Sequence, residues 1–129
     1  MVVIVIIGIV AAAAVLALPE PGGGLRGEAD KFAARAKAAQ EAAVINGRST
    51  ALRVALNGYA VAERRGGAWR DTATWGWDRG TQPDLAQGVT VQTVFDTTGI
   101  ADPLELTLRR ADQRMQVVIG SDGEVHVRR

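Results

Sequence analysis

The chain has 129 residues, a formal net charge of +1 and no cysteine. This length suits one domain, the net charge is too small to indicate nucleic-acid binding by itself, and disulfides and thiolate metal sites are excluded. All 15 Lys/Arg and all 14 Asp/Glu residues follow Leu18, so the first stretch differs physically from the rest.

Residues 1–18 form an apolar segment of eighteen residues without a charged or polar side chain. As a helix the segment would span about 27 Å, close to the roughly 30 Å hydrocarbon thickness of a bilayer. Because a helix satisfies its own backbone hydrogen bonds in lipid, we expect a transmembrane helix over 1–18. A cleaved signal peptide is the weaker alternative, since no basic residue precedes Val2.

Residues 19–24 combine two prolines with three glycines and predict a break between helical segments. The pattern beyond the break predicts an amphipathic helix over 25–46, which Gly47 ends. Its apolar positions recur at steps of four and three and are Leu25, Ala29, Phe32, Ala36, Ala39 and Ala43. Its charged residues are expected on the opposite, solvent face and are Glu28, Lys31, Arg35, Lys37 and Glu41.

From Ser49 onward the apolar period changes to two, which is typical of strands. Asn57-Gly58 between two alternating runs predicts a hairpin. The polar stretch 71–87 shows no clear period and is interpreted as a long loop. Strands are predicted over 51–56, 59–63, 89–95, 104–108, 115–119 and 125–127. The fold class is therefore α+β: a helix packed on an antiparallel sheet of about six strands between residues 49 and 129.

Catalytic and metal-binding patterns are not found. His126 is the only histidine and lies in a predicted strand, where an exposed position is expected, and both serines, Ser49 and Ser121, fall in predicted turns. No glycine-rich stretch joins a strand to a helix as a phosphate-binding loop requires. We expect no enzyme activity, no metal and no cofactor.

Two sets of side chains are candidates for contacts with other molecules. Trp75 and Trp77 are costly to leave in water, so they either cover the core or form a subunit interface. Basic side chains at strand ends would contact DNA phosphates if they cluster in space. They are Arg64, Arg65, Arg109 and Arg110.

The order of these elements resembles the type IV pilin-like proteins, and more narrowly the H-type minor pseudopilins and related minor pilins of the GspH/FimT family. The resemblance is carried by the apolar run from Val2, the alanine-rich helix ending at Asn46-Gly47 and the 52–56/59–62 hairpin. It continues through the Trp-containing stretch, Val94-Phe95-Asp96 with Gly99, the 104–108 strand and the closing hairpin with Gly123.

The resemblance implies a minor pseudopilin of the type II secretion system, a structural subunit of the periplasmic pseudopilus that exports folded proteins across the outer membrane. It implies a single pass through the inner membrane, with residues 25–129 in the periplasm and other pseudopilins as partners. Neither a small-molecule substrate nor nucleic acid is expected as a ligand. Filament packing of the apolar helix is expected at Val2, Ile4, Ile7, Gly8, Ala11, Ala12 and Val15.

One departure from the family pattern concerns the N-terminus. Family members begin with a basic leader, a Gly cleavage site, Phe-Thr-Leu and a nearby Glu, and their processed N-terminus is methylated. The resemblance places Met1 a few residues after that Glu, so we expect that the chain is truncated at its start.

Two alternative functions stay open. One is a type IV pilus minor pilin of the FimT kind, acting in pilus assembly or DNA uptake, which a basic patch at the tip of the sheet would favour. The other is an unrelated membrane-anchored periplasmic binding module, which a hydrophobic pocket would favour.

Overall fold

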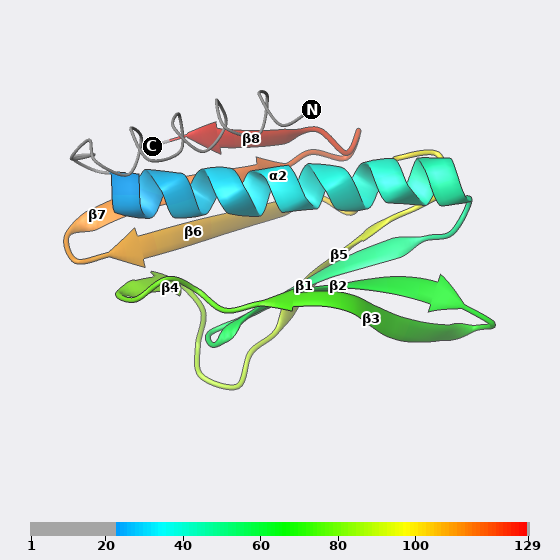
Figure 1. Cartoon of the computed structure of the whole chain (residues 1–129). Coiled ribbons are helices and arrows are strands. Elements are labelled where there is room, and N and C mark those ends of the chain that lie inside the picture. The colour runs from blue at the N-terminus through cyan, green and yellow to red at the C-terminus, as the bar shows by residue number, and fades with distance from the viewer. Residues whose placement is uncertain (1–22, 129) are drawn as a thin grey trace, which may run out of the picture.

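The computed structural model describes residues 23–128, which form one long helix lying across two antiparallel sheets (Figure 1). The helix, α2 (Gly23–Asn46), begins two residues before its predicted start. The expected membrane helix at 1–18 lies outside the described residues. Among the helical residues that are described, no stretch is long and apolar enough to cross a membrane.

Each sheet has four strands. Sheet A has the order β3-β2-β1-β5 and sheet B the order β4-β6-β7-β8, and every neighbouring pair is antiparallel. Sheet A contains β1 (Thr50–Ala55), β2 (Gly58–Arg65), β3 (Ala68–Trp75) and β5 (Val91–Phe95). Sheet B contains β4 (Thr81–Pro83), β6 (Leu104–Arg110), β7 (Gln113–Ile119) and β8 (Val125–Arg128). This confirms the predicted helix-on-antiparallel-sheet fold, with eight strands in two sheets where about six were expected.

The predicted apolar stripe of α2 is buried along its whole length. All six of its side chains are at most 3% exposed, and they pack with inward-facing residues of both sheets. Four of the six are alanines, which allow the strands to approach the helix closely. Gly47 follows the helix with φ +64°, the left-handed conformation that the sequence predicts for its end.

The predicted 71–87 loop is wrong at its start and in its middle. Residues up to Trp75 belong to β3, which pairs with β2 from Tyr59–Trp75 to Arg65–Ala68, and Thr81–Pro83 form β4. The period was hidden because β3 is an edge strand with mostly exposed or half-buried side chains, so it has no apolar face. The short β4 needs only three residues to pair with β6. What remains between them is the connection Gly76–Gly80, which carries the chain from sheet A to sheet B.

A second correction concerns Glu28, which was expected on the solvent face of the helix but is 1% exposed. It lies three residues after Leu25 and four before Phe32, so it shares their face of the helix. Arg35 is likewise half-buried, whereas Lys31, Lys37 and Glu41 are exposed as expected.

Gln40 fastens the end of sheet B to the helix. Its Nε2 donates to the carbonyl oxygens of Gly99, at 3.0 Å, and Asp122, at 3.3 Å, in two different loops. Gly123 lies so close to these groups that a Cβ there would collide with the Gly99 oxygen and the Gln40 amide. The β5–β6 and β7–β8 loops are therefore held together against the last turns of α2.

Candidate functional site

Four aromatic side chains fill the seam between α2 and sheet A, and we call them the aromatic seam: Phe32, Tyr59, Trp75 and Trp77. Tyr59 lies at the centre, with its ring centroid 4.9 Å from that of Phe32, 5.2 Å from that of Trp75 and 4.7 Å from that of Trp77. The indole Nε1 of Trp77 donates to the carbonyl oxygen of Ala55 at 2.9 Å. Both tryptophans are half-buried against the core, so the structure uses them to cover it.

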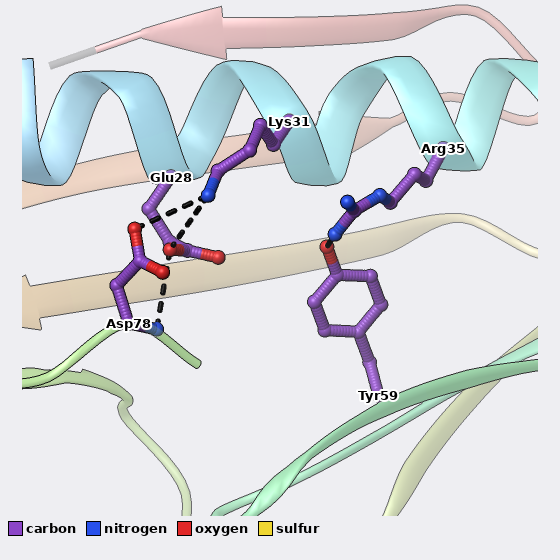
Figure 2. Close-up of polar contacts among 5 residues, drawn as sticks. All are labelled: Glu28, Lys31, Arg35, Tyr59 and Asp78. Atoms are coloured by element: carbon purple, nitrogen blue, oxygen red, sulfur yellow. Dashed lines mark hydrogen bonds and ion pairs between the residues drawn. The ribbon is translucent and has the colours of Figure 1, made fainter. Parts of the chain in front are cut away.

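Arg35 covers the aromatic seam from the helix. Its guanidinium Nη1 donates to the Tyr59 hydroxyl at 2.7 Å, as Figure 2 shows, and its Cζ lies 4.5 Å from the Trp75 ring centroid. A guanidinium stacked on an indole is a favourable arrangement, and the edge of the guanidinium remains in contact with water. Burial raises the pKa of Tyr59, while the Arg35 hydrogen bond opposes that shift. The phenol is therefore neutral and serves as an acceptor.

A polar cluster of Glu28, Lys31 and Asp78 lies beside the aromatic seam and ties Gly76–Gly80 to the helix (Figure 2). The Asp78 backbone N–H donates to Glu28 Oε2 at 3.2 Å, and Lys31 Nζ lies 3.2 Å from Asp78 Oδ2 and 3.6 Å from Glu28 Oε2. Glu28 Oε1 is buried without a hydrogen-bond partner among the described residues. A buried carboxylate oxygen without a donor is unfavourable when charged.

The protonation of this cluster follows from its burial. Desolvation, followed by the neighbouring Asp78, raises the pKa of Glu28, whereas hydrogen bonds from Glu28 and Lys31 lower that of Asp78. Of the two carboxyl groups, Glu28 therefore takes up a proton first as the pH falls, and Asp78 keeps its negative charge to lower pH. The hydrogen bond to Asp78 in turn raises the pKa of Lys31, which stays charged.

The four arginines predicted as a DNA contact do not lie together. Arg110 reaches the first turn of α2, where its guanidinium occupies the space beside Gly24. Arg65 pairs with Ala68 at the tip of the β2–β3 hairpin. Next to this tip, the hydroxyl of Thr50 on β1 donates to the carbonyl oxygen of Ala39, which lies far along the helix. The tip therefore lies toward the end of α2. Arg109 is the neighbour of Arg110 in the sequence and Arg64 is the neighbour of Arg65, so two of these four arginines lie at each end of the domain. No single patch joins all four.

A shallow depression of about 380 Å³ lies at one end of sheet A, around the β1–β2 turn. It is lined by backbone and side chains of mixed polarity, including Arg53, Asn57, Tyr59, Thr74 and Trp75. This is not the hydrophobic pocket that would mark a binding module.

His126 is exposed, as expected, with Nε2 3.4 Å from Glu124 Oε2. Within residues 23–128, no group of three or more His, Asp or Glu side chains could hold a metal ion. The surface carries charged side chains at the strand ends and half-exposed aromatic side chains, and both suit contact with another macromolecule.

Comparison with known structures shows the same fold. The chain is similar to the minor pseudopilin EpsH from the type 2 secretion system of Vibrio cholerae, with a TM-score of 0.68, 16% identity, and coverage of 81% of this chain and 95% of that one. It is similar to the type IV minor pilin FimU of Pseudomonas aeruginosa, with a TM-score of 0.66, 13% identity, and coverage of 81% and 88%. No curated protein matches the sequence significantly.

The family comparison covers most of the domain. The sequence matches the family described as "Type II transport protein GspH" over residues 28–123, from the polar cluster on α2 to the glycine of the last hairpin. The chain belongs to the GspH family of type II transport proteins.

Proposed function

We propose that this chain is a minor pseudopilin of a type II secretion system, a structural subunit of the periplasmic pseudopilus and not an enzyme. The observation that carries the proposal is the match to the GspH family across residues 28–123. The likeness of the fold to a minor pseudopilin supports it.

The proposal assigns each part of the chain a physical role. Residues 1–18 anchor the subunit in the inner membrane and then pack among the helices of neighbouring pseudopilins. Small side chains such as Gly8, Ala11 and Ala12 would let helices approach closely. The domain from residue 25 onward stands in the periplasm, and its partners are other major and minor pseudopilins. In this role the chain needs neither an active site nor a small-molecule substrate, because an ATPase elsewhere in the machine supplies the energy.

Trp75 and Trp77 remain candidates for a subunit interface through their half-exposed rims. Their contacts with the aromatic seam support a first role in folding. An interface there would use surface that is already fixed by the core, which limits the entropy lost on association.

The experiment is a deletion of the gene, with exoenzymes assayed in the culture supernatant beside twitching motility and DNA uptake. Exoenzymes trapped in the periplasm, with motility and uptake intact, are expected. A plasmid-borne copy of the gene is the control and should restore secretion. Normal secretion in the deletion strain would contradict the proposal.

The second candidate is a type IV pilus minor pilin, and the likeness to a type IV minor pilin favours it. In that case the same deletion impairs motility or DNA uptake and leaves secretion intact. Arg64, Arg65, Arg109 and Arg110 would then be tested as two separate pairs, because the structure divides them between two ends of the domain. The alternative of a binding module unrelated to pilins is contradicted by the family match.

A further inference from the structure

The hairpin between β6 and β7 lies at the end of the domain where α2 begins (Figure 1). We call this the proximal end, and the end where α2 stops the distal end. The guanidinium of Arg110 joins the hairpin to the helix, because it occupies the space beside Gly24 in the first turn of α2. The hairpin also carries Arg109 and Arg114, and the β3–β4 connection, which leads into the neighbouring β4, adds Arg79.

Two features of this hairpin work against folding. Arg109 and Arg114 are directly opposite each other on β6 and β7, and like charges in that position oppose strand pairing. Ala111 in the turn has φ +54°, a left-handed conformation that favours glycine, and no other non-glycine residue between 23 and 128 has a positive φ. Repulsion and backbone strain of this kind persist in folded proteins mainly at positions that serve a function.

The acids near the hairpin do not balance its charge. Asp84 lies 3.7 Å from Arg109, and Asp78 is bonded to Lys31. The hairpin itself contributes one acid, Asp112, at its exposed tip. Within residues 23–128, no acid lies within 4.0 Å of the three remaining arginines, Arg79, Arg110 and Arg114.

The start of α2 does not reverse this balance. Arg26 and Asp30 are both exposed and offset each other, whereas Glu28 is buried and bonded to the backbone of Asp78. Glu20, in the sequence before the described residues, removes one more positive charge. Three arginines without an ion pair therefore outnumber the remaining acids at the proximal end, and the surface stays positive.

The proposed membrane anchor leads directly into this end. The apolar run ends at Leu18, and the described helix begins at Gly23. Even fully extended, five residues span at most about 17 Å, roughly two Debye lengths at physiological ionic strength. With residues 1–18 in the membrane, the hairpin is therefore held close to the lipid headgroups. Their phosphates are anions that a guanidinium binds through paired hydrogen bonds.

We propose that the β6–β7 hairpin and Arg79 form a contact surface for anionic phospholipid headgroups of the membrane that anchors the chain. The inference rests on the proposed function at one step, the anchoring of residues 1–18. A headgroup phosphate between Arg109 and Arg114 turns their repulsion into a bridged contact. An anionic membrane strengthens binding about fivefold for each arginine near its surface, and the effect falls off within a Debye length. The contact orients the domain while the subunit is stored in the membrane and is broken when the subunit leaves.

The test uses the full chain, which has no cysteine, so that one introduced cysteine carries a fluorophore. Gln113→Cys places the label on the hairpin, and Ser121→Cys places it in the β7–β8 loop at the distal end; both positions are exposed. Each labelled chain is reconstituted in phosphatidylcholine vesicles that contain a nitroxide quencher on the lipid headgroup, with or without phosphatidylglycerol. Phosphatidylglycerol should increase quenching of the hairpin label at low salt but not at high salt, and should not affect the distal label.

Charge variants then test the arginines themselves. Arg109→Gln with Arg114→Gln should reduce the response to phosphatidylglycerol, by about fivefold for each arginine lost, and Arg109→Lys with Arg114→Lys should retain it. Lys37→Gln with Arg70→Gln is the matched control, because it removes the same charge from exposed positions away from the proximal end. Thermal unfolding separates this role from a structural one. The glutamine pair relieves repulsion, so its melting temperature should not fall.

Three results would overturn the inference. One is equal quenching of the hairpin label with and without phosphatidylglycerol, and another is an equal loss of response in the control pair. The third is a hairpin label that responds to inorganic phosphate or duplex DNA at constant ionic strength and not to phosphatidylglycerol.

Flotation with phosphatidylcholine vesicles reports on the anchor separately. A chain that floats without responding to phosphatidylglycerol rejects only this contact. A chain that does not float rejects the anchor and this contact with it. A normal deletion phenotype together with a positive response rejects only the role in secretion.

Discussion

Replacement of Trp77 by alanine tests whether the aromatic seam holds the two sheets and the helix together. The indole covers Phe32 and Tyr59, with ring centroids 5.8 Å and 4.7 Å away, and its Nε1 bonds to Ala55 at 2.9 Å. It also anchors the Gly76–Gly80 connection next to Asp78. Removing it opens the core where the chain passes from sheet A to sheet B.

The magnitude follows from its partial burial. A fully buried Trp replaced by Ala costs about 3–5 kcal/mol, and a half-buried one loses roughly half of that. The lost hydrogen bond, which leaves the Ala55 oxygen without its donor, adds about 1 kcal/mol. We therefore expect a loss of about 3 kcal/mol, or a melting temperature lower by roughly 10 °C for a domain of this size. Trp77→Phe keeps a ring over Tyr59 and should lose about 1 kcal/mol, mainly the hydrogen bond.

The assay is urea and thermal unfolding of the chain in detergent, followed by far-ultraviolet circular dichroism. Trp69→Ala is the matched control, because Trp69 lies on edge strand β3 and its ring is 5.8 Å from the Arg64 guanidinium. Trp69 is half-buried but is not among the residues packed against the core, and its contact with Arg64 is worth about 0.5–1 kcal/mol. Equal losses for Trp77→Ala and Trp69→Ala would refute the role assigned to the aromatic seam.

Three further predictions concern the polar contacts of the helix and the distal loops. Gln40→Ala removes the donors to Gly99 and Asp122 and should lower stability by about 1–2 kcal/mol. Hydrogen exchange should then accelerate in both loops, and faster exchange in only one would contradict the shared clamp. Gly123→Ala places a Cβ at φ +81° against the Gly99 oxygen and should lower stability by more than about 1 kcal/mol, measured as a lower urea midpoint; an unchanged midpoint would show that the loop can move aside. Glu28→Gln tests the raised pKa. The free energy of unfolding of the natural chain should fall as pH rises from the ordinary 4.5 of this carboxyl through its folded pKa, and the amide variant should lack that fall, so that its advantage grows with pH. A difference between the two chains that does not vary with pH would show that Glu28 is not protonated in the fold.

The sequence predicted the parts of the fold that have a regular apolar period. The stripe from Leu25 to Ala43 is confirmed because one buried side chain per helical turn leaves a strong signal. The Asn57-Gly58 hairpin and the central strands are confirmed for the same reason, since one face of each is buried. The edge strand β3 was missed because its mostly exposed or half-buried side chains carry no such period, and β4 was missed because three residues are too few to show one.

The polar cluster beside the aromatic seam was missed for a different reason. Glu28 was assigned to solvent by its residue type, although its position between Leu25 and Phe32 places it on the apolar face. Its burial depends on Asp78, fifty residues later, and nothing in either local sequence shows that the two will meet. The spacing of Glu28 from Leu25 and Phe32 was the signal that could have identified it, because a charged residue on a buried stripe needs a partner.

Residues that lie only on the surface report on assembly more directly than residues that also contact the core. Trp75 and Trp77 contact the core, so their replacement changes the stability of the subunit together with any contact it makes, and a loss of secretion would have two causes. Arg114 and Glu124 are exposed at opposite ends of sheet B, and changing them leaves the buried residues in place. Surface substitutions of this kind usually alter stability by less than about 0.5 kcal/mol. A secretion defect caused by reversing one of these charges would therefore measure contact of the subunit with its neighbours and not its folding.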